Sequence, residues 1–162
     1  RGTPENRPIR HIEQDARITE GTGMFISLKD HVHDEEVRQL LAYRALDDEQ
    51  LKQTIDAYGN EDFLELYGIA VDGEITGLIG YEYQGEGTLL LRDLVVKPEW
   101  RGLGYGRGLI LETIALEEPQ KLVVETDDET AVEFFRNIGF TIYSRGLDAF
   151  GGETFQCIYE CT

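Results

Sequence analysis

Residues 101–106 read Arg101-Gly102-Leu103-Gly104-Tyr105-Gly106 and lie between an apolar run, Thr88 to Val96, and a helical pattern, Leu109 to Leu116. A strand that passes through glycines into the start of a helix exposes several backbone N–H groups at once. Those groups and the positive end of the helix dipole attract anions, and glycines let an anion approach the backbone closely. The stretch therefore predicts a phosphate-binding loop.

The spacing of the glycines narrows the choice of ligand. No register of them fits the dinucleotide fingerprint G-x-G-x-x-G, and the chain has no Gly-Lys-Ser/Thr triplet of a Walker-type loop. The pattern that fits is R-x-x-G-x-G, at Arg101, Gly104 and Gly106. It resembles the pyrophosphate loop of the GNAT superfamily of acyl-CoA-dependent N-acyltransferases. On these residues alone, a glycine-rich turn without a ligand is the alternative.

A second motif lies downstream, where residues 131–140 read Ala-Val-Glu-Phe-Phe-Arg-Asn-Ile-Gly-Phe. This resembles the family's second signature, A-x-x-F-Y-x-x-x-G-F. The apolar residues share one helical face, and Gly139 is suited to end the helix. A strand-like segment, Lys121 to Thr126, separates the two motifs. The order of strand, glycine loop, helix, strand, helix and strand is the core order of the family, and the resemblance covers residues 24–160.

The periodicity of the chain predicts one α/β domain with a mixed and largely antiparallel sheet flanked by helices. The resemblance implies that this fold is GNAT-like. Asp72-Gly73 is a strong two-residue hairpin signal. Residues 24–162 are expected to form the domain, and residues 1–23 a polar N-terminal tail or a non-native remnant. The expected strands are 24–28, 63–71, 74–83, 88–96, 121–126, 140–144 and 154–161; the expected helices start at Asp34, Asp47, Leu109 and Ala131, with Asp34 and Asp47 as caps.

The composition of this 162-residue chain limits the classes of molecule that it is expected to bind. Its formal net charge is −17, from 32 acidic and 15 basic residues, which argues against nucleic acid and anionic membrane surfaces. The charge is compatible with a cationic substrate such as a free amine, although solubility alone can explain it. No stretch reaches the ~20 apolar residues of a membrane span. Cys157 and Cys161 read as free thiols, so we expect a cytoplasmic protein.

The resemblance implies acetyl-CoA as the acyl donor. Backbone N–H groups of residues 102–107 are implied to hold its pyrophosphate, and the main chain of residues 94–96 to pair with its pantetheine arm. A backbone N–H near Val96 is implied to face the thioester oxygen as an oxyanion hole. The cofactor-binding residues implied in this way are Leu94, Val95, Val96, Arg101, Gly102, Leu103, Gly104, Tyr105, Gly106, Arg107, Asp128 and Phe135.

Two residues depart from the family pattern. Many members carry Tyr where this chain has Phe135, and that hydroxyl protonates or hydrogen-bonds the leaving sulfur. Many also carry Asn where this chain has Asp128, and an ionised carboxylate cannot donate the hydrogen bond that Asn offers to pantetheine. Local alternatives exist for both: Phe135 as core packing, and Asp128 as a helix N-cap.

The proton acceptor is the least defined part of the predicted site. Counting back from Val96 by twos, the same face of the strand carries Leu94, Arg92 and Leu90, and none is a base; Asp93 points to the opposite face of an ideal strand. Glu82 on the preceding strand and Glu125 on the later one are the candidates, each of which can instead be a solvated carboxylate. His31 and His33, with Asp34, are read as surface loop, and no metal is expected.

These observations favour an N-acetyltransferase that moves the acetyl group of acetyl-CoA to a primary amine, on a small molecule or a protein, by direct attack on the thioester. A catalytically silent acyl-CoA-binding module is one alternative, because of Phe135 and Asp128. A structural domain without any cofactor is another. The resemblance allows a homodimer, and the sequence does not identify the acceptor.

Overall fold

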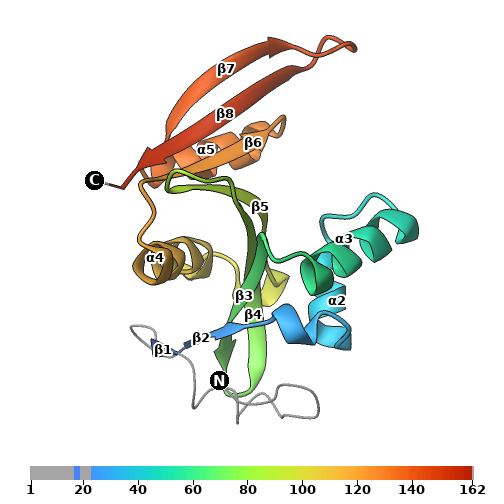
Figure 1. Ribbon diagram of the computed structural model, residues 1–162. Helices are drawn as coiled ribbons and strands as arrows, with labels where there is room; N and C mark the ends of the chain where they lie inside the picture. The colour runs from blue at the N-terminus through green and yellow to red at the C-terminus, as the bar shows by residue number, and fades with distance from the viewer. Residues whose placement is uncertain (1–16, 19–22, 162) are drawn as a thin grey trace.

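One mixed sheet runs through the protein, with its strands in the order β1-β2-β3-β4-β5-β6-β8-β7 (Figure 1). The computed structural model describes residues 17–18 and 23–161. Within them every neighbouring pair of strands is antiparallel except β5 and β6, which are parallel. The predicted mixed, largely antiparallel α/β fold is confirmed. The predicted tail, residues 1–23, lies outside the described residues except for Gly23 and the short strand β1, which pairs with β2.

The elements follow the predicted periodicity, except that α4 begins at Tyr105 rather than at Leu109, so the end of the predicted glycine loop forms the first turn of the helix. The strands are β1 Arg17–Ile18, β2 Met24–Ser27, β3 Leu64–Val71, β4 Glu74–Tyr83, β5 Thr88–Val96, β6 Lys121–Thr126, β7 Thr141–Leu147 and β8 Glu153–Glu160. The helices are α2 Glu35–Ala42, α3 Asp48–Asn60, α4 Tyr105–Glu117 and α5 Glu129–Asn137, with short 3₁₀ turns η2 Lys29–His31 and η3 Pro98–Trp100.

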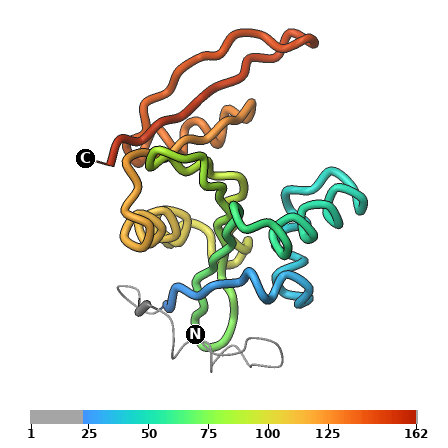
Figure 2. Tube along the Cα trace, in the orientation of Figure 1, coloured from blue at the N-terminus to red at the C-terminus, as the bar shows by residue number. Residues whose placement is uncertain are grey.

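Helices cover both faces of the sheet, and each face has its own core. Helices α2 and α3 pack on one face through buried residues such as Leu40 and Ile55, together with Leu78 and Val95 of the sheet. Helices α4 and α5 pack on the other through a second cluster that includes Phe135 (Figure 1). The β7–β8 hairpin extends past α5 at one end of the sheet (Figure 2). Two hydrophobic layers therefore hold β4 and β5 between the helix pairs.

Strands β5 and β6 pair over only a short distance. Their parallel ladder joins Thr88–Leu91 to Lys121–Val124 and ends there, while β5 continues to Val96 and β6 to Thr126. The two strands separate beyond this point, and the sheet opens between them (Figure 1).

An irregularity in β5 changes which residues face the helices. In the pairing of β4 with β5, Gly80 lies opposite Asp93 and Tyr81 opposite Leu91, so Arg92 is an extra residue, a β-bulge. As a result Leu89 and Leu91, rather than Leu90, lie on the α4/α5 side with Leu94 and Val96. The prediction that Leu90 shares a face with Val96 is therefore wrong, because it assumed a regular strand without a bulge. Asp93 faces the α3 side.

Local turn and cap signals were mostly reliable. Asp72 and Gly73 form the predicted hairpin turn with φ of 53° and 83°, and Gly139, with φ of 108°, follows α5. Asp47 caps α3 by accepting a hydrogen bond from the backbone N–H of Gln50 at 2.8 Å. Asp34 precedes α2 but makes no cap bond, which corrects the prediction; its carboxylate contacts Nδ1 of His31 at 2.9 Å instead.

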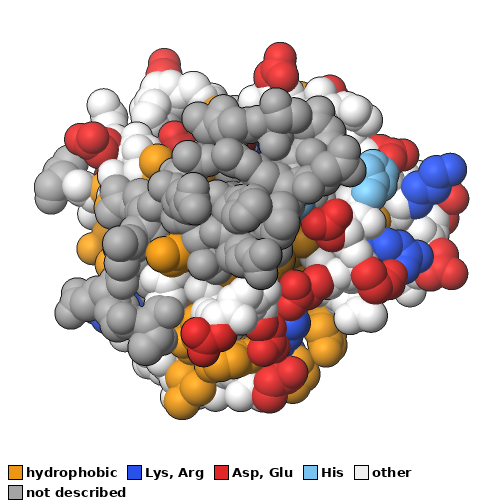
Figure 3. Space-filling view, turned by 90° about the horizontal axis from the view of Figure 1, so that it is seen from below, with side chains coloured by type: hydrophobic (Ala, Val, Ile, Leu, Met, Phe, Trp, Pro, Cys, Tyr) orange, Lys and Arg blue, Asp and Glu red, His pale blue; other side chains and the backbone are white. Residues whose placement is uncertain are grey.

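Charge is distributed broadly over the surface. Acidic side chains are spread over the described part of the face seen in Figure 3, which agrees with the net charge of −17. Among the described residues, no helix is both long enough and apolar enough to cross a membrane.

A single glycine lets α3 dock onto the sheet. Tyr58 is a fully buried residue of α3, and its ring lies against the backbone of Gly80 in β4. A Cβ added at Gly80 would lie 1.9 Å from the Tyr58 hydroxyl oxygen and 2.4 Å from the ring carbon that carries it. A side chain at position 80 therefore has no room unless Tyr58 moves.

We expect Gly80→Ala to lower the free energy of unfolding by about 1–3 kcal/mol, because the new methyl group overpacks the contact with Tyr58. Gly108→Ala in α4 is the matched control. Its Cβ would meet only Ile69, at 3.7 Å, and alanine favours the helix by about 1 kcal/mol. Urea unfolding of both variants measures the effects, and a Gly80→Ala protein as stable as the wild type would contradict the packing described.

Candidate active site

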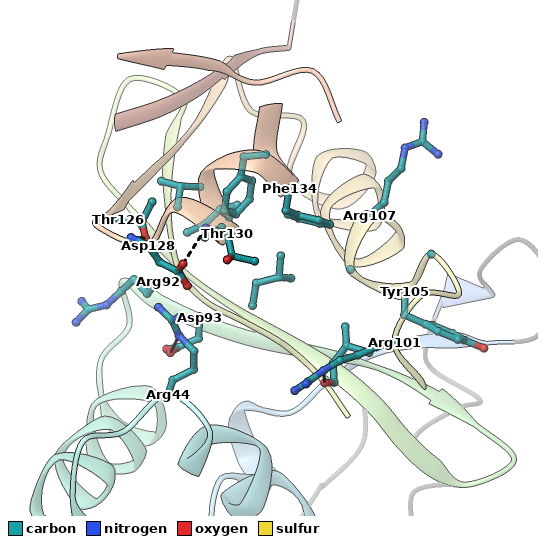
Figure 4. A pocket seen from close by; sticks show the side chains of 18 of the residues that line it. Arg44, Arg92, Asp93, Arg101, Tyr105, Arg107, Thr126, Asp128, Thr130 and Phe134 are labelled. Atoms are coloured by element: carbon teal, nitrogen blue, oxygen red, sulfur yellow. Dashed lines mark hydrogen bonds and ion pairs between the residues drawn. The ribbon is translucent and has the colours of Figure 1, made fainter. Parts of the chain in front are cut away.

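A cavity of about 590 Å³ occupies the opening between β5 and β6 (Figure 4). Its walls come from β5, the loop after it, the first turn of α4, the end of β6 and α5. Most of the residues singled out in the sequence meet here. Those that line it are Leu94, Val96, Arg101, Gly102, Gly104, Tyr105, Gly106, Arg107, Glu125, Asp128 and Phe135.

Three of the singled-out residues do not line this cavity. The Val95 side chain is buried in the core beneath α2 and α3, and the Leu103 side chain is 65% exposed. Glu82 pairs with Arg92, Oε1 to Nη1, at 2.9 Å. The structure thus brings the glycine loop, the strand edge and the second motif together, and leaves Glu82 apart from them.

The glycine loop leads directly into α4. Gly102 and Gly104 have φ of 77° and 90°, in the left-handed region that favours glycine, and Gly104 is the N-cap of the helix. A Cβ at either residue would meet nothing within 4 Å, so the backbone conformation, rather than crowding by the protein, requires glycine here. The open space in front of these residues is where an anion can approach the first-turn N–H groups of α4.

The turn before the loop is anchored to the body of the protein. Lys97 Nζ lies 2.7 Å from Glu36 of α2 and 3.2 Å from Glu74 of β4. Trp100 Nε1 also donates to Glu74, at 3.0 Å. Hydrogen bonds from Trp100 and then from Lys97 lower the pKa of the Glu74 carboxyl. These contacts fix η3, and with it the start of the loop.

The open edge of β5 presents main-chain hydrogen-bonding groups to the cavity. The N–H of Lys97 donates to the carbonyl of Thr76 at 2.8 Å. Because bonded and non-bonded pairs alternate along an antiparallel ladder, the N–H and C=O groups of Val96 and Leu94 point away from β4, toward the side that β6 has left. The carbonyl of Val96 accepts a hydrogen bond from Nε of Arg101 at 2.8 Å. The Arg101 guanidinium also lies 5.8 Å from the ring centre of Tyr43.

The two departures from the family pattern have structural roles. Asp128 is the N-cap of α5, where its Oδ1 accepts a hydrogen bond from the backbone N–H of Thr130 at 2.9 Å (Figure 4). Phe135 is buried, with ring centres 5.1 Å from Phe134 and 5.0 Å from Phe140. Both residues also line the cavity, so these roles do not remove them from it.

Sequence reasoning missed a polar cluster centred on Asp93. The Tyr58 hydroxyl donates to Oδ2 of Asp93 at 2.6 Å, and Nε of Arg44 lies 3.7 Å from Oδ1. Burial and then the nearby Asp93 carboxylate raise the pKa of Tyr58, so its hydroxyl stays protonated and remains a donor. The Asp93 side chain is 13% exposed. It borders the large cavity and a second cavity of about 210 Å³ under α2 and α3.

Among the described residues no group of three or more His, Cys, Asp or Glu side chains is arranged to hold a metal ion. His31, which the sequence indicated as part of a surface loop, is instead buried in η2, and its Nδ1 is hydrogen-bonded to Asp34. Cys157 and Cys161 are free thiols, as predicted.

Comparison with known proteins identifies the domain. The family model described as "Acetyltransferase (GNAT) domain" matches residues 62–142, half of the chain. This match spans β3 to the start of β7, and so includes the glycine loop and the second motif. A search of curated proteins finds no match.

Solved structures share the fold. A GNAT-family protein from Desulfovibrio desulfuricans is similar with a TM-score of 0.74 and 19% identity, over 87% of this chain and 100% of that one. A GNAT-family acetyltransferase from Elizabethkingia anophelis with acetyl-CoA bound has a TM-score of 0.60 and 17% identity, over 75% and 88%. A mutant of the spermidine N-acetyltransferase from Vibrio cholerae has a TM-score of 0.68 and 12% identity, over 86% and 94%.

Two variants of Asp128 separate the effect of its capping hydrogen bond from the effect of its negative charge. We expect Asp128→Ala to cost about 1 kcal/mol of unfolding free energy, because the N–H of Thr130 loses its acceptor. Asp128→Asn should stay within a few tenths of the wild type, since Asn caps helices equally well. Urea unfolding measures both, and equal losses in the two variants would show that charge rather than the cap matters.

Proposed function

The chain belongs to the GNAT acetyltransferase family, and from that premise we propose that it transfers the acetyl group of acetyl-CoA to a primary amine. One observation carries the proposal. The cavity between the separated strands joins an anion-binding helix start at one end to a carboxylate, Asp93, at the other. A long phosphorylated thioester and a basic acceptor can meet in such a site.

The glycine loop holds the pyrophosphate of acetyl-CoA in this proposal. Backbone N–H groups of residues 102–107 surround it, in the open space that Gly102 and Gly104 leave. Arg101 and Arg107 supply positive charge beside the loop. The acetyl-CoA found in the E. anophelis structure supports this choice of ligand.

The edge of β5 holds the pantetheine arm. An extended chain with amide groups can pair with the main chain of residues 94–96, as an added strand does. It takes over the carbonyl of Val96, so Arg101 gives up its present hydrogen bond there. The N–H of Val96 then faces the thioester oxygen and stabilises the developing negative charge, an effect worth ~3 kcal/mol for one donor.

Asp93 receives the amine. It lines the cavity, whereas Glu82 is held by Arg92 outside it and Glu125 lies on the other wall, in β6. The Asp93 carboxylate binds the acceptor as an ammonium ion and takes its proton. The free amine then attacks the thioester carbonyl carbon, the nitrogen gives up a second proton to solvent, the carbon–sulfur bond breaks, and CoA leaves as a thiolate.

Phe135 gives the leaving sulfur no hydroxyl. A thiolate whose thiol has a pKa of ~8.5 is still an acceptable leaving group, and solvent can protonate it afterwards. The free thiols of Cys157 and Cys161 are in keeping with the reducing cytoplasm in which we propose that the enzyme works. A homodimer stays a prediction.

The loop is tested by a matched pair of variants at Gly104. We expect Gly104→Asp to abolish saturable binding of acetyl-CoA, because it places a negative charge at the anion site. Gly104→Asn has the same size and a similar tolerance of positive φ, and should bind with a loss of about tenfold or less. Isothermal calorimetry with acetyl-CoA, and with ADP and NAD as control ligands, measures this. Normal binding by Gly104→Asp would place the pyrophosphate elsewhere.

The proton acceptor is tested by turnover. We expect Asp93→Asn to lower kcat by about a hundredfold or more while acetyl-CoA binds as before, because Asn keeps the hydrogen bond from Tyr58 but takes no proton. Release of CoA in the presence of a panel of primary amines measures kcat, and Asp56→Asn on the exposed face of α3 is the control. A larger loss in Glu82→Gln or Glu125→Gln than in Asp93→Asn would assign the role to that glutamate.

A further inference from the structure

The smaller cavity, of about 210 Å³, adjoins Asp93, the carboxylate that receives the acceptor in the proposed reaction. It is lined by residues of α2, α3, the segment between them, β3 and β5, and it shares Arg44, Arg92 and Asp93 with the large cavity. Leu41, Ala45 and other apolar residues form part of its wall. An acceptor bound in the smaller cavity can therefore reach the thioester through this charged junction.

The charges at the junction are mixed in sign. Among the described residues that line the smaller cavity, Asp93 is the single acid, and Arg44 and Arg92 are the bases. Arg92 is engaged by Glu82 at 2.9 Å, and Figure 4 shows its side chain directed away from Arg44 and Asp93. Arg44 and Asp93 point toward one another (Figure 4). Their closest approach, Nε to Oδ1, is 3.7 Å, longer than a hydrogen bond.

An ion pair that is not hydrogen-bonded can open around a ligand with the complementary charges. The Arg44 side chain is 52% exposed and comes from the segment between α2 and α3. Asp93, in contrast, is held by Tyr58 and is only 13% exposed. Arg44 can therefore move, whereas Asp93 is fixed.

We infer that the acceptor is a small amino acid or a close analogue, an amine that carries a carboxylate within a few bonds of its nitrogen. Its ammonium group binds Asp93, and its carboxylate binds the guanidinium of Arg44 in a planar, two-point contact. This inference rests on the proposed function, and it defines the acceptor that the proposed site selects.

Size and charge argue against larger or more cationic acceptors. A volume of about 210 Å³ leaves room in the smaller cavity for a compact molecule. A polyamine would place further ammonium groups beside two guanidiniums and a single carboxylate, an arrangement that like-charge repulsion disfavours. The strongly negative charge of the whole protein thus does not describe the charge of this cavity.

Matched pairs of amines test the inference. Alanine, valine and methionine are compared with ethylamine, isobutylamine and 3-(methylthio)propylamine, the same molecules without the carboxylate, and spermidine is added. Transfer is followed by CoA release, and binding of each amine to the full chain in the presence of CoA is followed by calorimetry. We expect KM to be lower for the amino acids than for their partners by about tenfold or more.

Arg44→Gln is the decisive variant, and Arg38→Gln, an exposed arginine of α2, is its control. Arg44→Gln should raise KM for the amino acids far more than KM for the plain amines, so that the preference for amino acids disappears. Equal or better use of plain amines or spermidine by the wild type, or an unchanged preference in Arg44→Gln, would overturn the inference while the proposed function stands. Binding of acetyl-CoA without transfer to any amine would instead refute the proposed function, and the calorimetry of amino-acid binding would still decide the role of Arg44.

Discussion

The separation of β6 from β5 is the constraint on which the rest of the site depends. A parallel pair that ended together would satisfy all of its main-chain groups internally, but here the ladder stops at Leu91 and Val124. The groups of Leu94 and Val96 then need partners from elsewhere. Arg101 supplies one for the carbonyl of Val96. The cavity, the exposed strand edge and the position of the loop are all consequences of this one interruption of the sheet.

The bulge at Arg92 is a second feature of β5 that shapes the site. By inserting one residue before the open part of β5, it turns Asp93 toward α3 and keeps Leu94 and Val96 on the side of α4 and α5. A single short segment thereby serves both faces of the sheet. Its main chain borders the cavity that we assign to the cofactor, and its one carboxylate reaches the cavity that we assign to the acceptor.

The sequence predicted what depends on near neighbours in the chain. The helices and strands, the Asp72-Gly73 turn, the Asp47 cap and the end of α5 at Gly139 each follow from residues within a few positions of one another. The sequence did not predict the cluster of Tyr58, Asp93 and Arg44. This cluster depends on the register between two strands and on the docking of α3. The alternation of side chains along β5 was predicted wrongly because the strand contains a bulge, and no residue near the bulge signals it in the sequence. Asp34 shows the same limit, since a buried histidine competes for its carboxylate.

The contact between Tyr58 and Gly80 has a consequence for how the sequence can change over evolutionary time. A side chain at position 80 fits without displacing the ring only if position 58 becomes smaller, and a smaller residue there removes the hydroxyl that holds Asp93. We therefore expect substitutions at the two positions to be coupled. Covariation between positions 58 and 80 should mark the lineages that keep a carboxylate at position 93, so that the packing of a helix and the chemistry of the cleft are inherited together.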